Sequence, residues 1–143
     1  MRTVSDIIKR KGTHVWSVGP DATVYDILRL MAEHEIGAVV VIEQGKVVGI
    51  FSERDYARQV ILKGRTSKDT PVREVMSPRV MFVRPEQTVE DCMALMTDKR
   101  VRHLPVLKEG ALLGMVSIGD VVKDMIADRE FTIEQLANYI QRG

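Results

Sequence analysis

The sequence has a single cysteine, Cys92, and few aromatic residues: three Phe, three Tyr and one Trp among 143 residues. One cysteine cannot form an internal disulfide, which fits a reducing, cytoplasmic setting. No apolar run approaches the ~20 residues that span a bilayer, so no membrane segment is predicted. The opening residues, MRTVSDIIKRKG, lack the apolar core and cleavage site of a secretory signal. With so few aromatic rings, we expect a core of aliphatic side chains and methionine.

The sequence also has little net charge. Lys and Arg number 21 against 20 Asp and Glu, which leaves +1. Proteins that bind nucleic acid usually carry a clear basic excess, so we expect no nucleic-acid partner. The length suits one domain or two very small ones.

Familiar catalytic patterns are absent as well. The three histidines, His14, His34 and His103, form no H-E-x-x-H pattern, and there is no G-x-S-x-G, Walker A or G-x-G-x-x-G motif. Cys92 lies on the apolar face of a predicted helix, where a core role is the simpler interpretation. We therefore expect no enzyme and no metal site.

What the chain does contain is an internal repeat. Shifted by 65 residues, Val15–Tyr56 aligns without a gap on Val80–Val121, and thirteen of the 42 aligned pairs are identical. Several of the other pairs exchange one aliphatic residue for another. Two copies of this period indicate a duplicated unit, not a solenoid.

Each copy predicts the same order of elements, β-α-β-β-α, so the fold class is α/β (α+β) with two repeats. A short apolar strand, at 15–18 or 80–83, precedes a helix that begins T-x-x-D, at Thr23 or Thr88, a variant of the capping box. Two strands follow as a hairpin around Gly45 or Gly110. A last helix begins at Ser52 or Ser117.

These patterns predict four segments. Residues 4–62 form the first domain, 63–71 a polar linker, 72–126 the second domain and 127–143 a C-terminal amphipathic helix. The apolar face of that helix can pack on its own domain or on a second subunit, and the sequence does not decide between the two.

The motif that both copies keep is G-h-h-S-x-x-D, where h is apolar: GIFSERD at 49–55 and GMVSIGD at 114–120. The glycine permits close approach of another group. The serine lies at a helix N-terminus, which favours phosphate, and the aspartate can accept both hydroxyls of a ribose. The motif thus fits a ribose-phosphate site, but S-x-x-D is also a workable helix start without any ligand.

A basic cluster occurs in the second copy only. Lys99, Arg100, Arg102 and His103 precede its strand, whereas the first copy has His34, Glu35, Gly37 and Ala38. Arg102 can offer a bidentate guanidinium to phosphate. Cations at a helix end also suit the helix dipole, which accounts for Lys99 and Arg100 without a ligand.

Several segments in this order resemble a known family. They are VREVMSPRVMFVRPEQTVEDCMALM at 72–96, VRHLPVL at 101–107 and the two G-h-h-S-x-x-D motifs. Together with the duplicated unit they resemble a tandem pair of CBS domains, a Bateman module, in a stand-alone protein of bacterial type. The resemblance spans residues 4 to about 125.

The resemblance implies that the two repeats pack as one pseudo-twofold module, and it also implies a ligand and a site. Adenosyl ligands such as AMP, ADP, ATP, NAD or S-adenosylmethionine would bind in clefts between the two repeats. Asp120 and Asp55 would hold ribose hydroxyls, and Ser117 and Ser52 would contact phosphate or ribose. The remaining expected ligand-binding residues are Arg102, His103 and Arg54 toward phosphate, Val80, Met81, Phe82, Val15, Trp16 and Ser17 around the adenine, and Gly119, whose place Arg54 takes in the first copy.

The leading hypothesis is a non-catalytic sensor of adenine nucleotides, which signals through conformational change to an effector protein and forms a homodimer. The alternative is a ligand-independent module for dimerisation or partner docking.

Overall fold

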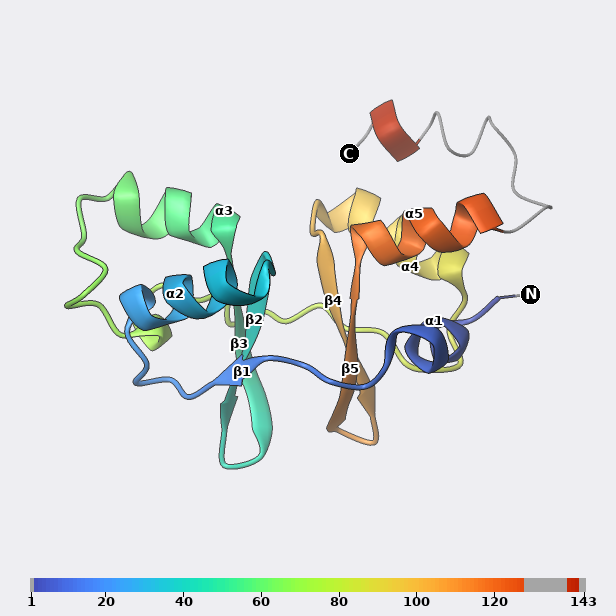
Figure 1. The fold of residues 1–143 in the computed structure, drawn as a ribbon, viewed down its shortest axis with the longest axis horizontal. Helices are drawn as coiled ribbons and strands as arrows, with labels where there is room; N and C mark the ends of the chain where they lie inside the picture. Colours follow the sequence, from blue (N-terminus) through green and yellow to red (C-terminus); the bar gives the residue numbers. More distant parts are fainter. Residues whose placement is uncertain (1, 128–138, 142–143) are drawn as a thin grey trace. The chain divides into compact units, whose positions relative to one another are not determined.

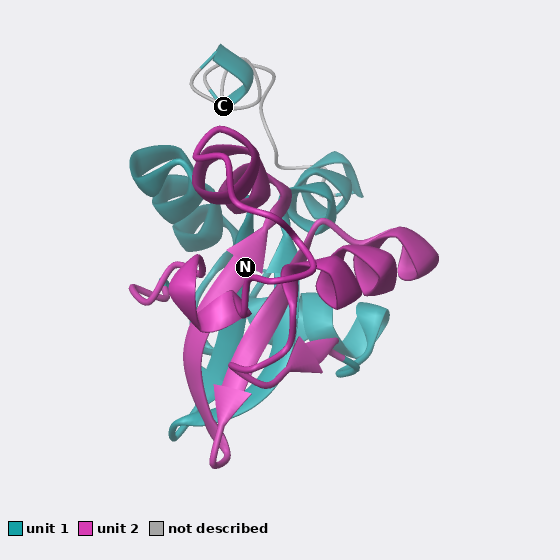
Figure 2. Ribbon diagram, turned by 90° about the vertical axis from the view of Figure 1, so that its left-hand side faces the viewer, with its two compact units in different colours: residues 1–14, 81–143 teal, residues 15–80 magenta. Residues whose placement is uncertain are grey.

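The computed structural model describes residues 2–127 and 139–141, and the chain divides into two compact units. Unit 1 consists of Met1–His14 with Met81–Gly143, and unit 2 is Val15–Val80 (Figure 2). The first repeat lies in unit 2 and nearly all of the second in unit 1. The N-terminal segment therefore belongs to the unit that contains the other repeat.

Unit 2 contains a three-stranded sheet in the order β1-β2-β3. Its elements are β1 (Ser17–Val18), α2 (Val24–His34), β2 (Ala38–Glu43), β3 (Lys46–Ser52), α3 (Glu53–Asp55), the π-helix η1 (Tyr56–Ile61) and the 3-10 helix η2 (Val72–Glu74) (Figure 1). β1 runs parallel to β2, and β2 pairs antiparallel with β3.

Unit 1 repeats this plan with one difference. Its elements are α1 (Val4–Lys11), α4 (Val89–Lys99), β4 (His103–Lys108), β5 (Ala111–Ser117) and α5 (Ile118–Ala127). β4 and β5 pair antiparallel. The apolar stretch 80–83, expected as a strand, contributes only a single parallel bridge between Val83 and Val106. The predicted mixed helix and strand class with two repeats is confirmed.

Helix starts and hairpin turns follow the sequence pattern. Thr23 and Thr88 cap α2 and α4, and their hydroxyls accept the backbone N–H of Asp26 and Asp91. Each hairpin turns through two residues with positive φ, Gln44–Gly45 and Glu109–Gly110. Two positive φ values define the tight type I′ turn, which suits the strand twist and favours glycine at the second position.

The segments that precede the two repeats are exchanged. α1, before the first repeat, packs on the second repeat, and η2, before the second repeat, packs on the first. In unit 1, the N–H of Val4 donates to Gln87 O at 2.8 Å, and that of Val89 donates to Arg2 O at 3.1 Å. In unit 2, the N–H of Val72 donates to Ala22 O at 2.8 Å, and that of Val24 donates to Thr70 O at 2.9 Å. The two exchanges use equivalent positions, so the duplication extends to how the chain enters each repeat.

Each unit has its own aliphatic core, as the shortage of aromatic residues suggested. Phe51 is the largest fully buried side chain of unit 2, surrounded mainly by valine, isoleucine and methionine. Cys92 is fully buried in the core of unit 1, and burial raises the pKa of its thiol to about 12. A thiol in this environment is an inert core residue, as predicted.

The sequence predicts two segments outside the repeats, a polar linker and a C-terminal helix. The polar stretch 63–71 packs onto unit 2: Ser67 O accepts the N–H of Tyr25 at 3.0 Å, and Thr70 is buried. Of the expected C-terminal helix, residues 139–141 are helical and most of the remainder lies outside the described residues.

Candidate functional site

The two G-h-h-S-x-x-D motifs form strand-to-helix turns, one in each unit. Ser52 ends β3 and caps α3, while Ser117 ends β5 directly before α5. Across each hairpin the serine pairs with the first residue of the neighbouring strand, Ala38 in unit 2 and His103 in unit 1.

In both turns the serine and aspartate cap the helix reciprocally. Asp55 Oδ2 accepts from Ser52 N at 2.9 Å and from Ser52 Oγ at 3.0 Å, and Ser52 Oγ accepts from Asp55 N at 3.3 Å. In unit 1, Asp120 Oδ2 accepts from Ser117 N at 2.8 Å, and Ser117 Oγ accepts from Asp120 N at 3.2 Å. Capping thus accounts for both residue types, and each carboxylate also lies at the helix N-terminus, where anionic ligands are favoured.

Asp120 has a further partner that the sequence did not indicate. Lys11, the last residue of α1, donates from Nζ to Asp120 Oδ2 at 2.7 Å and to the carbonyl oxygen of Met115 at 2.8 Å. Burial alone would raise the pKa of Asp120, but hydrogen bonds from Lys11 and Ser117 outweigh burial and hold this pKa below its ordinary value. The carboxylate is therefore ionised at neutral pH.

Two of the predicted basic residues lie directly opposite this turn. Arg102 O accepts the N–H of Ile118 at 2.9 Å, and His103 is the cross-strand partner of Ser117. Burial lowers the pKa of His103, Lys11 and Arg102 lower it further, and Asp120 opposes them. His103 is accordingly a neutral imidazole at pH 7, one donor and one acceptor within a basic cluster.

This shift predicts a pH dependence of stability. As pH falls below 6.5, the unfolded chain protonates His103 while the folded chain resists, so the free energy of unfolding should decrease. The slope contributed is at most about 1.4 kcal/mol per pH unit. Urea unfolding between about pH 7 and pH 5.5 should show this decrease in the wild type and less of it in His103→Gln.

The matched control is His14→Asn, at an exposed histidine. His103 is intact in this variant, so the decrease attributed to His103 should persist. An unchanged slope in His103→Gln would exclude a pKa shift at His103 as its origin. The lowered pKa of Asp120 affects stability only below its ordinary value of 3.8, outside this window.

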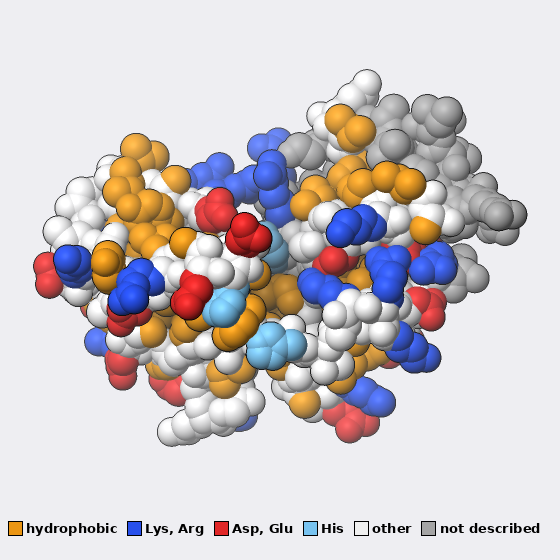
Figure 3. Space-filling model, viewed as in Figure 1, with side chains coloured by type: hydrophobic (Ala, Val, Ile, Leu, Met, Phe, Trp, Pro, Cys, Tyr) orange, Lys and Arg blue, Asp and Glu red, His pale blue; other side chains and the backbone are white. Residues whose placement is uncertain are grey.

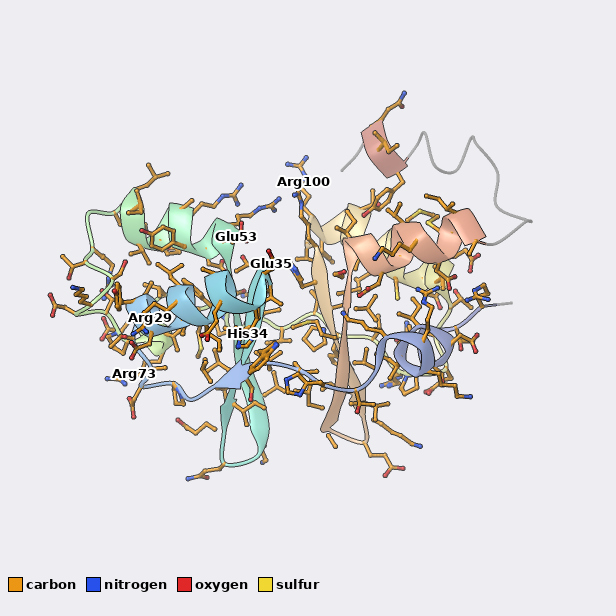
Figure 4. The ribbon with its side chains drawn as sticks, viewed as in Figure 1. Arg29, His34, Glu35, Glu53, Arg73 and Arg100 are labelled. Atoms are coloured by element: carbon orange, nitrogen blue, oxygen red, sulfur yellow. The ribbon has the colours of Figure 1, made fainter. Side chains whose placement is uncertain are left out.

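The corresponding turn of unit 2 has a different environment. His34 and Glu35 lie at the carboxyl end of α2, with Glu53 at the start of α3 nearby (Figure 4), and Figure 3 shows acidic side chains gathered there. Glu53 N donates to Gly37 O at 3.1 Å, which fixes that proximity. Arg54, half-buried in α3, is the predicted cation of this turn.

The residues expected around adenine fall into both units. Val15, Trp16, Ser17 and Val80 belong to unit 2, and Met81 and Phe82 to unit 1. The indole of Trp16 stacks on the imidazole of His34, with ring centroids 3.7 Å apart. Val40 N donates to Trp16 O, and Ala38 pairs with Ser52, so Trp16 enters the sheet at the end where Ser52 lies.

In unit 1, Phe82 is 42% exposed, while Met81 packs against the core. Val83 N donates to Pro105 O at 3.0 Å, so the segment around Val83 lies along β4. Gly119, the second residue of α5, is exposed.

The duplicated glycines are explained by packing. A Cβ at Gly114 would lie 2.6 Å from Ile8 Cδ1, and one at Gly49 would collide with the side chain of Met76. The group predicted to approach each glycine is thus an apolar side chain of the exchanged segment. The glycines admit that segment, and ligand approach is not needed to account for them.

Gly114→Ala should therefore destabilise the protein by about 1–3 kcal/mol, because the new methyl group overpacks the site. Adding Ile8→Val, which removes Cδ1, should recover part of this loss, so that the double variant is more stable than the two single effects predict. Gly119→Ala is the control, since its Cβ meets only Ser117 Oγ at 3.6 Å. Wild-type stability of Gly114→Ala in urea unfolding would contradict this explanation.

Tyr139 is a candidate that sequence reasoning missed. Its side chain is buried, its hydroxyl has no hydrogen-bond partner within the described part of the chain, and the charge of Arg102 acts on its pKa. Burial raises that pKa, so the phenol is protonated at neutral pH. The described C-terminal residues thus bring a donor toward the basic cluster.

Neither of two other site classes is found within residues 2–127 and 139–141. No group of three or more His, Cys, Asp or Glu side chains there could hold a metal ion. No helix within those ranges is long and apolar enough to cross a membrane.

Two repeats with capped Ser…Asp turns, each packed against the segment that precedes the other repeat, make up a tandem module. The CBS domain family model matches residues 4–61 and 72–127, and the chain belongs to the CBS domain family. Domains of this family are generally regulatory and non-catalytic.

Similar proteins come from plants and bacteria. The chain is 42% identical to CBS domain-containing protein CBSX3, mitochondrial, of Arabidopsis thaliana, covering 99% of this chain and 73% of that protein. It is 34% identical to CBS domain-containing protein YhcV of Bacillus subtilis, covering 81% and 82%. A solved protein with CBS domains from Burkholderia ambifaria is 49% identical with a TM-score of 0.85, covering 92% of this chain and 98% of that one.

Proposed function

We propose that this protein is a non-catalytic regulatory module that binds an adenosyl nucleotide at its Ser…Asp turns. The observation that carries the proposal is the turn of unit 1. There an ionised carboxylate, Asp120, lies at the N-terminus of α5 beside Lys11, Arg102 and His103.

The chemistry of this turn suits a nucleotide. A carboxylate accepts two ribose hydroxyls in charge-assisted hydrogen bonds, which are stronger than neutral ones. Cations and a helix N-terminus favour phosphate. AMP, ADP, ATP and NAD share these two parts, so the geometry supports the class and leaves the choice among its members open.

The fold gives independent support. A solved CBS-domain pair in complex with 5′-methylthioadenosine and S-adenosylmethionine superposes with a TM-score of 0.77 at 18% identity. At that identity the likeness concerns the fold alone. It means that a pair with this fold accommodates adenosyl ligands in that protein.

We further propose that binding shifts a conformational equilibrium that an effector protein reads, which requires a ligand that prefers one conformation. The Burkholderia protein is described provisionally as a signal-transduction protein.

A homodimer belongs to the same proposal. Figure 3 shows hydrophobic side chains over η1 of unit 2 and over α5 of unit 1. At these helices Ile61, Leu62 and Ile126 are 55%, 78% and 71% exposed. A cytoplasmic location stays a prediction of the sequence.

A second candidate is a docking module that needs no small ligand. The reciprocal capping of Ser52 and Asp55 favours it, because both side chains are satisfied by the helix start itself. This candidate predicts a folded protein that self-associates or holds its partner equally well with and without nucleotide.

Calorimetric titration separates the two. Titration of the full chain with AMP, ADP, ATP, NAD and S-adenosylmethionine should show saturable binding of at least one compound with a Kd below about 1 mM. A folded protein that binds none of the five would contradict the nucleotide proposal and favour the docking module.

A further inference from the structure

The contact between Lys11 and Asp120 bears on which ligands the unit 1 turn accepts. Lys11 Nζ donates to the same oxygen, Asp120 Oδ2, that also accepts the N–H of Ser117. In this arrangement Asp120 is 17% exposed and Lys11 is 35% exposed. A ribose that uses both carboxylate oxygens must therefore compete with the lysine ammonium for Oδ2.

Lys11 reaches the unit 1 turn because it is the last residue of α1, the exchanged segment. α1 precedes the first repeat in sequence but packs in unit 1, where Ile8 fills the space at Gly114 and Lys11 reaches the end of β5. At the equivalent turn of unit 2, the same aspartate oxygen accepts the Ser52 hydroxyl. The lysine thus distinguishes the unit 1 turn from its duplicate.

An ammonium beside the carboxylate affects charged and uncharged ligands differently. A nucleoside without phosphate breaks the Lys11–Asp120 contact and offers no anion in return. A nucleotide offers phosphate, which is expected near Arg102 and His103. Lys11 reaches the same turn, where its contact Asp120 lies three residues after Ser117, the cross-strand partner of His103. Displacement of Lys11 is therefore unfavourable for the nucleoside and compensated for the nucleotide.

We propose that Lys11 is a specificity-determining residue of the unit 1 turn, which blocks Asp120 against uncharged nucleosides and moves to the phosphate when a nucleotide binds. The inference rests on the proposed function and deepens it, because it assigns the selectivity for phosphate to a residue outside the duplicated motif.

The test compares AMP with adenosine. Dissociation constants are measured by calorimetry for the full-length wild type, Lys11→Met, Lys11→Arg and Lys9→Met. In Lys11→Met, adenosine should bind more tightly and AMP more weakly than in the wild type, so the preference for AMP should decrease about tenfold or more. Lys11→Arg retains the charge and should keep most of the preference.

Lys9→Met is the matched control, since Lys9 is an exposed lysine of the same helix, and it should keep the wild-type preference. A wild type that prefers AMP, together with an unchanged preference in Lys11→Met, would overturn the role of Lys11 and leave the proposed function intact. Equal weakening of both ligands would overturn it too. A folded wild type that binds neither AMP nor adenosine would overturn both proposals.

Discussion

Asp120→Ala should weaken binding of AMP by about 1.5–3 kcal/mol, a rise in Kd of roughly 10- to 150-fold. The reason is the loss of an ionised acceptor for ribose hydroxyls. Ser117 N and Lys11 Nζ also lose their common partner, Asp120 Oδ2. Calorimetric titration of the folded variant with AMP measures the effect.

Two variants make this result specific. Asp98→Ala removes a carboxylate that is 74% exposed, and it should bind AMP like the wild type. Asp120→Asn keeps an acceptor for the helix cap but not the charge, so it should fold like the wild type and still bind weakly. Wild-type affinity in both Asp120 variants would remove Asp120 from the site.

Simultaneous replacement of Arg2 and Arg10 by methionine should lower the free energy of unfolding by about 3 kcal/mol or more. Asp124 is buried, with a side chain only 1% exposed, and it accepts from Arg2 Nε at 2.7 Å and from Arg10 Nη1 at 3.5 Å. The ion pair is buried on the side of the carboxylate, while Arg2 and Arg10 are 41% and 42% exposed. Removal of both guanidinium groups leaves the buried carboxylate without counter-charges, which is strongly destabilising. Urea unfolding at constant pH measures the change.

The compensating variant adds Asp124→Leu to the two arginine changes. It removes the buried charge and should recover most of the lost stability, because an apolar replacement of a whole buried ion pair is often neutral. Lys9→Met serves as the surface control. If the arginine double variant had the same urea midpoint of unfolding as the wild type, burial of the Asp124 carboxylate would not depend on Arg2 and Arg10 as counter-charges.

The two predictions concern the same helix pair. Asp120 and Asp124 lie one turn apart on α5, and residues of the N-terminal segment hold both of them. The arginines fix α1 against α5, and this orientation presents Lys11 to Asp120. If Lys11 has the proposed role, stability and ligand selectivity in unit 1 are linked through α1.

Much of this architecture was predictable because it depends on local interactions. Thr23 and Thr88 with an aspartate three residues later specify helix starts, and Gly45 and Gly110 specify hairpin turns. The Ser…Asp turns were also predictable, since the duplication retained both residues at the same spacing.

The remainder depends on contacts between residues far apart in the chain. Lys11 and Asp120 are 109 positions apart, and nothing in a repeat alignment says which copy the preceding segment packs on. The sequence around Asp124 gave no sign that this carboxylate would be buried, and the stack of Trp16 on His34 depends on β1 lying beside β2. Tertiary packing decided each of these.

The most direct test of the central claim is a titration of the ¹⁵N-labelled full chain followed by its backbone amide resonances. Addition of AMP should shift the amide signals of Ser117, Ile118 and Asp120 saturably, because ribose and phosphate would bind at the groups these amides adjoin. A folded spectrum in which none of the three signals moves with AMP, ADP, ATP, NAD or S-adenosylmethionine, up to concentrations of about 1 mM, would contradict the account.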